Sequence, residues 1–428
     1  MKVMASMNLQ DEPPEKKRSR KKKRTTHSSP PASSSSPSFS LLPDEIALNC
    51  LARISRAYYP RFSIISKSFR SLLSSMELYL ARSQIGSTEQ CLYVCLSDES
   101  YQYPQWFTRW INPNRTLPNS TIKKKKKTLR QSSLAPIPSS HFPSVSESAL
   151  VVGSDIYVIG GPIKTEPVSK ERSRLCPSSA VRVLDCRTHT WRDAPSMILA
   201  RKHALTCFHN GKIYVMGGCK ALEEPWAEVY DTNTQTWKPL SDPGTEISKI
   251  SRCTFYSIKE KNGKIYFGNA YETHAYDTSQ DNWESIAQFQ SSTWLTDGGF
   301  WFHRIPKPAC LMDGVWYNIS HGPFHCWWSK DGRFWKGVKG LESLREMYNR
   351  NGGSSRNKTV LVSCGGKLLL LWEGYMEHNP SNRQKIWCAE INLETDAKGE
   401  VRGNVEWIDV VQTVRTQCEL LHCLVVSV

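Results

Sequence analysis

Residues 204–218 read ALTCFHNGKIYVMGG, and residues 227–237 read AEVYDTNTQTW. In the first stretch, two apolar runs flank Asn210-Gly211, a dipeptide that favours the tight turn of a β-hairpin. A double glycine, Gly217-Gly218, follows the second run. The second stretch has another apolar run, then an aspartate and a polar turn before Trp237. Together they predict four short antiparallel strands joined by tight turns.

This pattern recurs along the chain. Trp191, Trp237 and Trp283 follow one another at intervals of 46 residues, and an apolar residue followed by Asp precedes each of them at the same spacing. A fixed period of this size indicates stacked supersecondary units, none of which can bury its apolar face alone. Four short strands per unit are typical of a β-propeller blade.

Five such units are recognisable, and their regularity decreases along the chain. They cover roughly residues 149–191, 204–237, 262–283, 313–335 and 364–407. Strand-like runs at 92–96 and 106–110 precede the units, and another at 420–426 follows them. Pairing the first and last runs in one sheet would cover two exposed sheet edges. We therefore predict a mainly β chain with a propeller at 91–428, of six blades with a composite last blade; five blades are the alternative.

The repeated residues have structural roles in this prediction. The double glycines, Gly160-Gly161 and Gly217-Gly218, allow backbone angles and close approaches that side chains prevent. The aspartate makes the tight turn before the last strand. Each tryptophan places one large face between adjacent blades, and this role is favoured over an aromatic ligand site.

Positive charge is concentrated in two stretches. The chain has 428 residues and a formal net charge of +16. Residues 1–38 are rich in charge, Ser and Pro, and predict a disordered basic tail. A second basic run, Lys123 to Lys127, lies in a predicted exposed loop at 112–140. Each stretch has a functional interpretation as a polyanion or import contact and a plain one as a solvated segment. A candidate nuclear-import site comprises Lys16, Lys17, Arg18, Lys21, Lys22, Lys23 and Arg24.

The 14 cysteines show neither CxxC pairs nor zinc-ligand spacing, so we expect reduced, mostly buried thiols, no metal and no cofactor. No apolar run approaches the ~20 residues that a membrane-spanning helix needs. Nothing at the N-terminus resembles a secretory signal. The expected location is the nucleus, the cytoplasm or both.

Residues 39–85 form a separate helical region. Ala47, Cys50, Leu51 and Ile54 follow helical spacing, and a second stripe runs from Phe62 to Met76. A third, shorter helix is predicted at 78–85. Three short helices bury too little surface to be stable alone, so this region needs a partner, either the downstream domain or another protein.

The phrase LPDEIALNCLARISRAYYPRFSIISKSFRSLL, residues 42–73, resembles an F-box, especially those of plant F-box/kelch-repeat proteins. The resemblance implies that these helices dock on the Skp-type adaptor of a cullin–RING ubiquitin ligase. Ser68-Phe69-Arg70 stands where the family often has a tryptophan. The residues expected to contact the adaptor are Leu42, Pro43, Ile46, Leu51, Ile54, Ile65 and Phe69.

The repeats in turn resemble kelch repeats, which implies a kelch-type propeller that holds a protein target for ubiquitination. Rigid scaffolds carry recognition on their loops, where Trp and Arg are favoured anchors. Trp226, Arg201 and Trp294 are therefore the candidate target contacts. The sequence leaves open the target, its need for phosphorylation or a small molecule, and the face of the propeller that binds it.

Catalysis by the chain itself is not expected. No nucleophile elbow, phosphate-binding loop, zinc-protease motif or dinucleotide fingerprint is present. A copper-radical oxidase can use a kelch propeller, but no recognisable set of Cys, Tyr and His ligands appears. The alternative to the ligase receptor is a non-catalytic nuclear or cytoskeletal scaffold whose basic segments contact nucleic acid, with binding that weakens steeply with salt.

Overall fold

The structure is a computed structural model. It describes residues 42–98, 103–111, 133–139, 141, 148–164, 175–220, 223–244, 247, 257–261, 263–268, 272–288, 295–296, 299–301, 309–320, 324–330, 334–353, 358–374, 384–414 and 418–428. The predicted basic tail with its import site, the run Lys123 to Lys127 and Trp294 lie outside the described residues.

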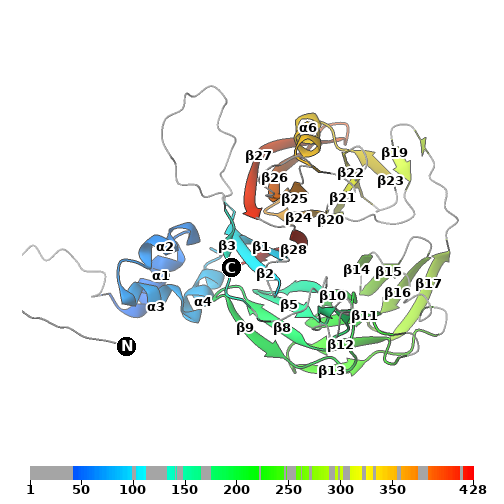
Figure 1. The fold of residues 1–428 in the computed structure, drawn as a ribbon, viewed down its shortest axis with the longest axis horizontal. Helices are drawn as coiled ribbons and strands as arrows, with labels where there is room; N and C mark the ends of the chain where they lie inside the picture. Colours follow the sequence, from blue (N-terminus) through cyan, green and yellow to red (C-terminus); the bar gives the residue numbers. More distant parts are fainter. Residues whose placement is uncertain are drawn as a thin grey trace, which may run out of the picture. The chain divides into compact units, whose positions relative to one another are not determined.

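Six antiparallel sheets of at least four strands form the β region, and their strands are labelled in Figure 1. Blade 1 has the order β4 (Ala149–Val152), β5 (Asp155–Ile159), β8 (Val181–Asp185) and β9 (Thr190–Ala194). Blade 2 has the order β10 (Leu205–His209), β11 (Lys212–Met216), β12 (Ala227–Asp231) and β13 (Thr236–Pro239). Blade 3 has the order β14 (Ser257–Lys261), β15 (Lys264–Gly268), β16 (Glu272–Asp277) and β17 (Asn282–Gln288).

The other three blades depart from this plain pattern. Blade 4 comprises β20 (Ala309–Met312), β21 (Val315–Ser320), β22 (His325–Ser329) and β23 (Phe334–Gly337), and β19 (Gly299–Trp301) and β18 (Leu295–Thr296) extend its outer edge. Blade 5 comprises β24 (Thr359–Cys364), β25 (Lys367–Gly374), β26 (Gln384–Thr395) and β27 (Val401–Val414). Blade 6 has the order β28 (Cys418–Ser427), β1 (Gln90–Asp98), β2 (Gln105–Trp110) and β3 (Ala135–Pro136). A two-stranded ribbon of β6 (Ile163–Lys164) and β7 (Leu175–Cys176) lies in the connection between β5 and β8.

Blade 6 is composite, as predicted. β28 pairs antiparallel with β1 from Gln90↔Ser427 to Asp98↔Cys418, with one irregularity after Cys95. It takes the innermost position that β4, β10, β14, β20 and β24 hold in the other blades. Five pairs of innermost strands from neighbouring blades lie side by side: β4 with β10, β10 with β14, β20 with β24, β24 with β28, and β28 with β4. The prediction of a mainly β chain with six blades is therefore confirmed.

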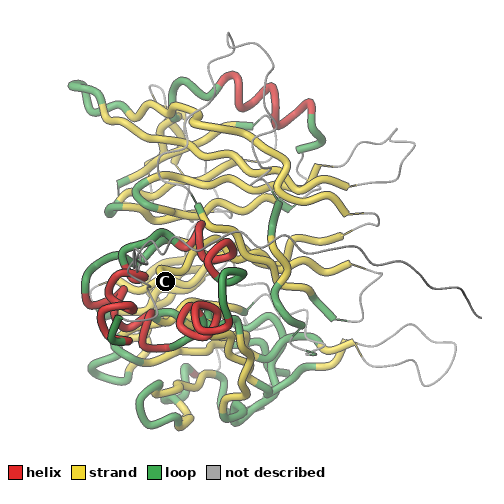
Figure 2. Tube along the Cα trace, turned by 90° about the vertical axis from the view of Figure 1, so that its left-hand side faces the viewer, coloured by secondary structure: helices red, strands yellow, loops and turns green. Residues whose placement is uncertain are grey.

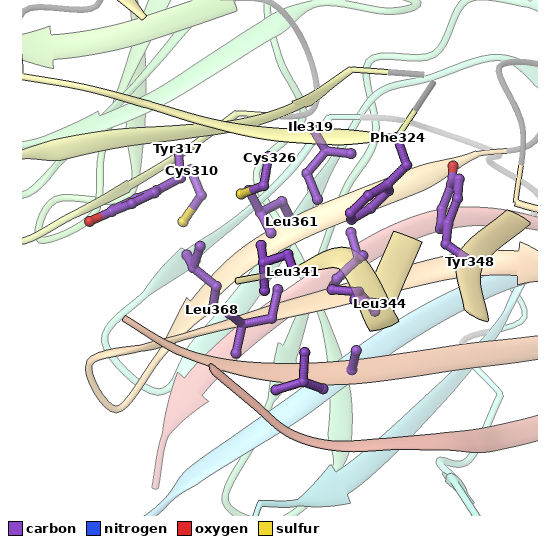
Figure 3. Close-up of a cluster of buried hydrophobic side chains, with 14 of the residues drawn as sticks. Cys310, Tyr317, Ile319, Phe324, Cys326, Leu341, Leu344, Tyr348, Leu361 and Leu368 are labelled. Atoms are coloured by element: carbon purple, nitrogen blue, oxygen red, sulfur yellow. The ribbon is translucent and has the colours of Figure 1, made fainter. Parts of the chain in front are cut away.

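The core lies between blades. Apolar clusters fill the spaces between blades 1 and 2, 2 and 3, 4 and 5, 5 and 6, and 6 and 1. Between blades 4 and 5 the connection contains a helix, α6 (Glu342–Arg350). Figure 3 shows Leu341, Leu344 and Tyr348 of this segment among side chains of both blades. The interfaces between blades, and not the single sheets, therefore supply the hydrophobic stabilisation.

The repeated tryptophans have the predicted sealing role and an additional one. The indole Nε1–H of Trp191 donates to the carbonyl oxygen of Pro138 at 3.0 Å, and that of Trp237 to Pro195 at 2.8 Å. Trp283 repeats the bond, to Ser241 at 2.9 Å. Each acceptor follows the outermost strand of the preceding blade. Each tryptophan thus joins two blades by a hydrogen bond as well as by packing.

The double glycines are also used as predicted. Gly160 and Gly218 have φ of +55° and +74°, where L side chains are strained. A Cβ on Gly218 would lie 2.7 Å from the carbonyl oxygen of Lys202, and one on Gly160 would lie 2.8 Å from that of Ser178. Both glycines therefore let a neighbouring backbone segment approach more closely than any side chain would allow.

The propeller has two unlike faces. In the side view of Figure 2 the strands cross the ring, so connections gather at the two strand ends. At one end, which we call the short-turn face, lie tight turns such as Gly153-Ser154 and Asn210-Gly211 and the four-residue turns after β8, β12 and β16. The opposite end, the long-connection face, carries longer segments such as 160–180, 195–204 and 338–358. The long connection from β2 to β3, residues 111–134, is an exception, because β2 ends at the short-turn face.

Short helices precede β1: α1 (Asp44–Ala52), the 3-10 turn η2 (Arg56–Tyr58), α2 (Tyr59–Phe62), α3 (Lys67–Leu73) and α4 (Met76–Gln84). The single helix predicted from Phe62 to Met76 is divided, because α2 ends at Phe62 and α3 begins after Ser66. The Ser66 backbone is extended, and its hydroxyl accepts the N–H of Phe69 at 3.1 Å, so it caps a new helix. None of the described helices is both long and apolar enough to cross a membrane.

Candidate docking surfaces

One buried arginine organises the helical region. Arg82 of α4 is 1% exposed, and its guanidinium donates to the carbonyl oxygens of Ala52 at 3.1 Å and Ile54 at 2.7 Å. It also donates to the Tyr59 hydroxyl at 3.0 Å. These carbonyls belong to the C-terminal end of α1 and the residues after it, where helices leave acceptors unpaired. A single side chain thus holds the end of α1, the start of α2 and α4 together.

The helices leave large apolar side chains exposed. Ile64 and Ile65, between α2 and α3, are 77% and 62% exposed, and Tyr58 and Leu80 are also exposed. Basic residues accompany them, since Arg53, Arg61, Lys67 and Arg70 are exposed as well. Exposed apolar anchors surrounded by charge are typical of a protein-docking surface.

The residues that the sequence assigned to adaptor contact fall into three groups. Leu42, Pro43, Ile46 and Ile65 are exposed, Ile54 and Phe69 are half-buried, and Leu51 is 1% exposed. The Phe69 ring stacks on Phe62 with the centroids 6.1 Å apart. Burial places Leu51 in the packing of the helices, where it supports the exposed residues around it. The F-box resemblance did not include Ile64, Tyr58 and Leu80 among the adaptor contacts, although their apolar character was visible in the sequence.

The structure places two of the candidate target contacts in the interior. Arg201 and Trp226 are 0% and 5% exposed, so neither side chain is available to a target. The indole of Trp226 packs in blade 2 against Phe267 and Trp283 of blade 3, with ring centroids 5.7 and 5.5 Å away. Both residues lie in connections, as expected, but the connections fold inward between blades.

Arg201 instead joins blades 1 and 2. Its Nε donates to Glu228 Oε1 at 2.8 Å, and both side chains are 0% exposed. Its other nitrogens donate to the carbonyl oxygens of Gly217, Trp226 and Pro225 at 2.7, 2.7 and 2.6 Å. Its own carbonyl accepts the N–H of Gly161 in blade 1 at 2.9 Å. The same connection exposes Pro195, Ser196, Ile198, Lys202 and His203.

A histidine at the short-turn face has unusual acidity. Burial, with the nearby Arg56 guanidinium, lowers the pKa of His189 from 6.5 to about 4. Its Nε2 lies 3.0 Å from the Tyr93 hydroxyl, which donates to the carbonyl oxygen of Cys186. The folded protein therefore holds His189 neutral at neutral pH.

Stability is expected to fall as the pH drops from about 6.5 to about 4, because the unfolded histidine binds a proton there and the folded one does not. The free energy of unfolding falls by at most about 3 kcal/mol at pH 4. Above pH 6.5 His189 has no effect on it. His189→Gln should remove this part of the pH dependence in urea unfolding. Gln235 occupies the same turn position in blade 2, with φ of +56° against +57° at His189, so the backbone accepts the change. If the free energy of unfolding of His189→Gln falls between pH 6.5 and 4 as steeply as that of the parent protein, the lowered pKa of His189 is contradicted.

No cluster of three or more His, Cys, Asp or Glu that could hold a metal ion occurs among the described residues. Burial raises the pKa of the thiols of Cys326, Cys364 and Cys388 to about 12 each. These thiols act as small buried side chains in the blade cores.

A helical docking module joined to a six-bladed propeller defines the class of F-box proteins with a kelch domain. Residues 39–81 match the F-box domain, and residues 106–412 match the FKB95, Kelch-repeats domain. The chain is 55% identical to F-box/kelch-repeat protein At4g19870 of Arabidopsis thaliana over 92% of its own length and 94% of that protein. It is 53% identical to F-box/kelch-repeat protein At4g19865 of the same plant, over 92% and 93%. The chain therefore belongs to the plant F-box/kelch-repeat family. Proteins of this family are generally non-catalytic adaptors, and the resemblance inferred from the sequence is confirmed.

Proposed function

We propose that this chain is the substrate-recognition subunit of an SCF-type cullin–RING ubiquitin ligase. The observation that carries the proposal is the pair of exposed apolar side chains, Ile64 and Ile65, in the turn between α2 and α3, within the region that matches the F-box domain. F-box domains in general bind Skp-type adaptors, and kelch propellers bind protein targets. The chain transfers no ubiquitin itself; it raises the local concentration of target lysines near the charged carrier enzyme.

The target is proposed to bind at the long-connection face. Gln90, the first residue of β1, pairs with Ser427 at the short-turn face, so the helical region is continuous in sequence with that face. The long-connection face is the opposite one, and it has the exposed Ile198, Lys202 and His203. An adaptor and a target bound in this way would not compete for the same surface.

The adaptor test uses charge insertion at the exposed pair. Ile64→Asp with Ile65→Asp should lower the affinity for a purified Skp-type adaptor about 100-fold or more, since buried anchors contribute roughly 2 kcal/mol or more each. Titration calorimetry or a quantitative pull-down measures this change. Exposed positions are chosen because substitution of the buried Leu51 would disturb the helices themselves.

Leu311→Asp is the control, because Leu311 is also an exposed aliphatic residue and lies on β20 of the propeller. It should leave adaptor binding within about twofold of the parent protein. Equal adaptor affinity of the double variant and the parent would reject the proposed function. So would the absence of any adaptor binding by the parent protein.

A further inference from the structure

The segment that leads from α4 into β1 is held by bonds along its length. Only residues 85–89 separate Gln84, the last residue of α4, from Gln90, the first of β1. The Ser87 carbonyl accepts a bond from Arg82 Nη2 at 2.6 Å, and its hydroxyl donates to the Ala52 carbonyl at 2.7 Å. The Glu89 N–H donates to the Val428 carbonyl at 2.8 Å, and the Val428 N–H returns a bond to Glu89 at 2.9 Å. This segment is therefore fixed to the helices at one end and to blade 6 at the other.

Glu89 is the residue that connects the two ends. Its backbone belongs to blade 6 through Val428, and its carboxylate belongs to the helices. Oε2 accepts a bond from Arg82 Nη2 at 2.9 Å and one from the backbone N–H of Arg56 at 2.7 Å. Bonds to an ionised acceptor are about twice as strong as neutral ones, and Arg82 is almost fully buried.

The Arg56 side chain makes a second connection. Its guanidinium lies over the ring of Tyr79 in α4, 5.2 Å from the centroid, and 3.9 Å from Cys91 Sγ in β1. It also lies close enough to His189 in blade 1 to lower the pKa of that histidine. Arg82 and Arg56 of the helical region thus both contact residues at the start of β1. Arg56 also lies near the turn that follows β8.

We propose that Arg82 and Glu89 form a rigid joint that fixes the orientation of the helices from α2 to α4 on the propeller. Glu89 is accordingly a positioning residue for ubiquitin transfer, which makes this part of the inference rest on the proposed function. In that transfer a lysine amine attacks the thioester of the charged carrier; an isopeptide bond forms, the carrier thiol leaves, and the amine loses a proton. Transfer therefore depends on how narrowly the receptor confines the position of each lysine.

The joint is tested with Glu89→Ala in the full-length protein, first by hydrogen–deuterium exchange. Exchange should rise about tenfold or more in peptides that contain Arg56 and residues 85–90, while peptides from blades 2 and 5 are unchanged. Glu89→Gln keeps an acceptor without the charge and should show a smaller rise. Glu223→Ala is the matched control, because Glu223 pairs with Lys220 at 3.3 Å on the exposed surface of blade 2. Unchanged exchange at 85–90 in Glu89→Ala would overturn the joint.

The positioning role is tested in a reconstituted ligase, with a Skp-type adaptor, cullin, RING subunit, charged carrier and ubiquitin. The lysines of the receptor that become modified are mapped by mass spectrometry. Glu89→Ala should spread ubiquitin over more propeller lysines than in the parent protein, while its adaptor affinity stays within about twofold. Glu89→Gln should restore part of the parent protein's pattern of modified lysines. An unchanged map with raised exchange would overturn the positioning role alone. A parent protein that binds no adaptor would reject the proposed function, and the exchange experiment would still decide the joint.

Discussion

Replacement of Arg201 by methionine is expected to lower the free energy of unfolding by about 3–5 kcal/mol, the usual cost of removing one partner from a buried ion pair. The substitution leaves the Glu228 carboxylate buried opposite an apolar side chain and removes bonds to three backbone carbonyls. Glu228 Oε2 also accepts the N–H of Ile198 at 2.7 Å, so the 195–204 connection loses its anchor too. Urea unfolding followed by tryptophan fluorescence measures the change.

The chain offers a control ion pair with the same N–O distance and a different environment. Arg192 and Asp155 also lie 2.8 Å apart, but the Arg192 side chain is 45% exposed. Arg192→Met should therefore cost no more than about 1 kcal/mol. The double variant Arg201→Met with Glu228→Leu should be more stable than Arg201→Met alone, because no charge remains buried. Similar losses for Arg201→Met and Arg192→Met would show that burial does not set the energy of the pair.

Replacement of Trp372 by alanine is expected to cost about 3–5 kcal/mol as well, by opening a cavity in the core between blades 4 and 5. Trp372 is fully buried, stacks on Trp387 with ring centroids 5.9 Å apart and an angle of 10°, and contacts the ring of Tyr348 from α6 at 5.5 Å. The loss should appear in the same urea experiment. Leu344 and Tyr348 should become more accessible, as increased exchange of the α6 amides.

Trp372→Phe separates volume from hydrogen bonding. The indole N–H of Trp372 has no hydrogen-bond acceptor among the described residues. Trp372→Phe therefore removes only part of the packing. It should lower the free energy of unfolding by less than about 1.5 kcal/mol. A phenylalanine variant as unstable as the alanine variant would mean that the indole N–H has an acceptor after all.

The propeller was predictable because its signals are local and repeated. Asn210-Gly211, the double glycines and the evenly spaced tryptophans each specify a turn, a close approach or a blade interface within one unit. The composite blade followed from the need to cover the sheet edges at 92–96 and 420–426. α6 was missed, although Leu341, Leu344 and Tyr348 have the spacing of a helical face.

The candidate sites were less predictable, because burial in a connection depends on partners far away in sequence. The local sequence around Arg201 predicts an exposed side chain. Only its contact with Glu228, 27 residues later, reveals that the side chain is buried. The same holds for Leu51, whose apolar character fits either a docking surface or a helix core. The role of Glu89 as a link between the helices and blade 6 could be predicted only by knowing that β1 and β28 are neighbours.

The composite blade also has a consequence for biosynthesis. β1 spans residues 90–98, whereas its partner β28 spans residues 418–427, so the ribosome must add more than 300 residues before this pair can form. Until then the free edge of β1, with buried-type residues such as Leu92 and Val94, remains open to other strands. Ring closure is therefore a late event on the nascent chain. Stalled translation products that stop before residue 418 should aggregate or need chaperones, whatever the intrinsic stability of blades 1 to 5.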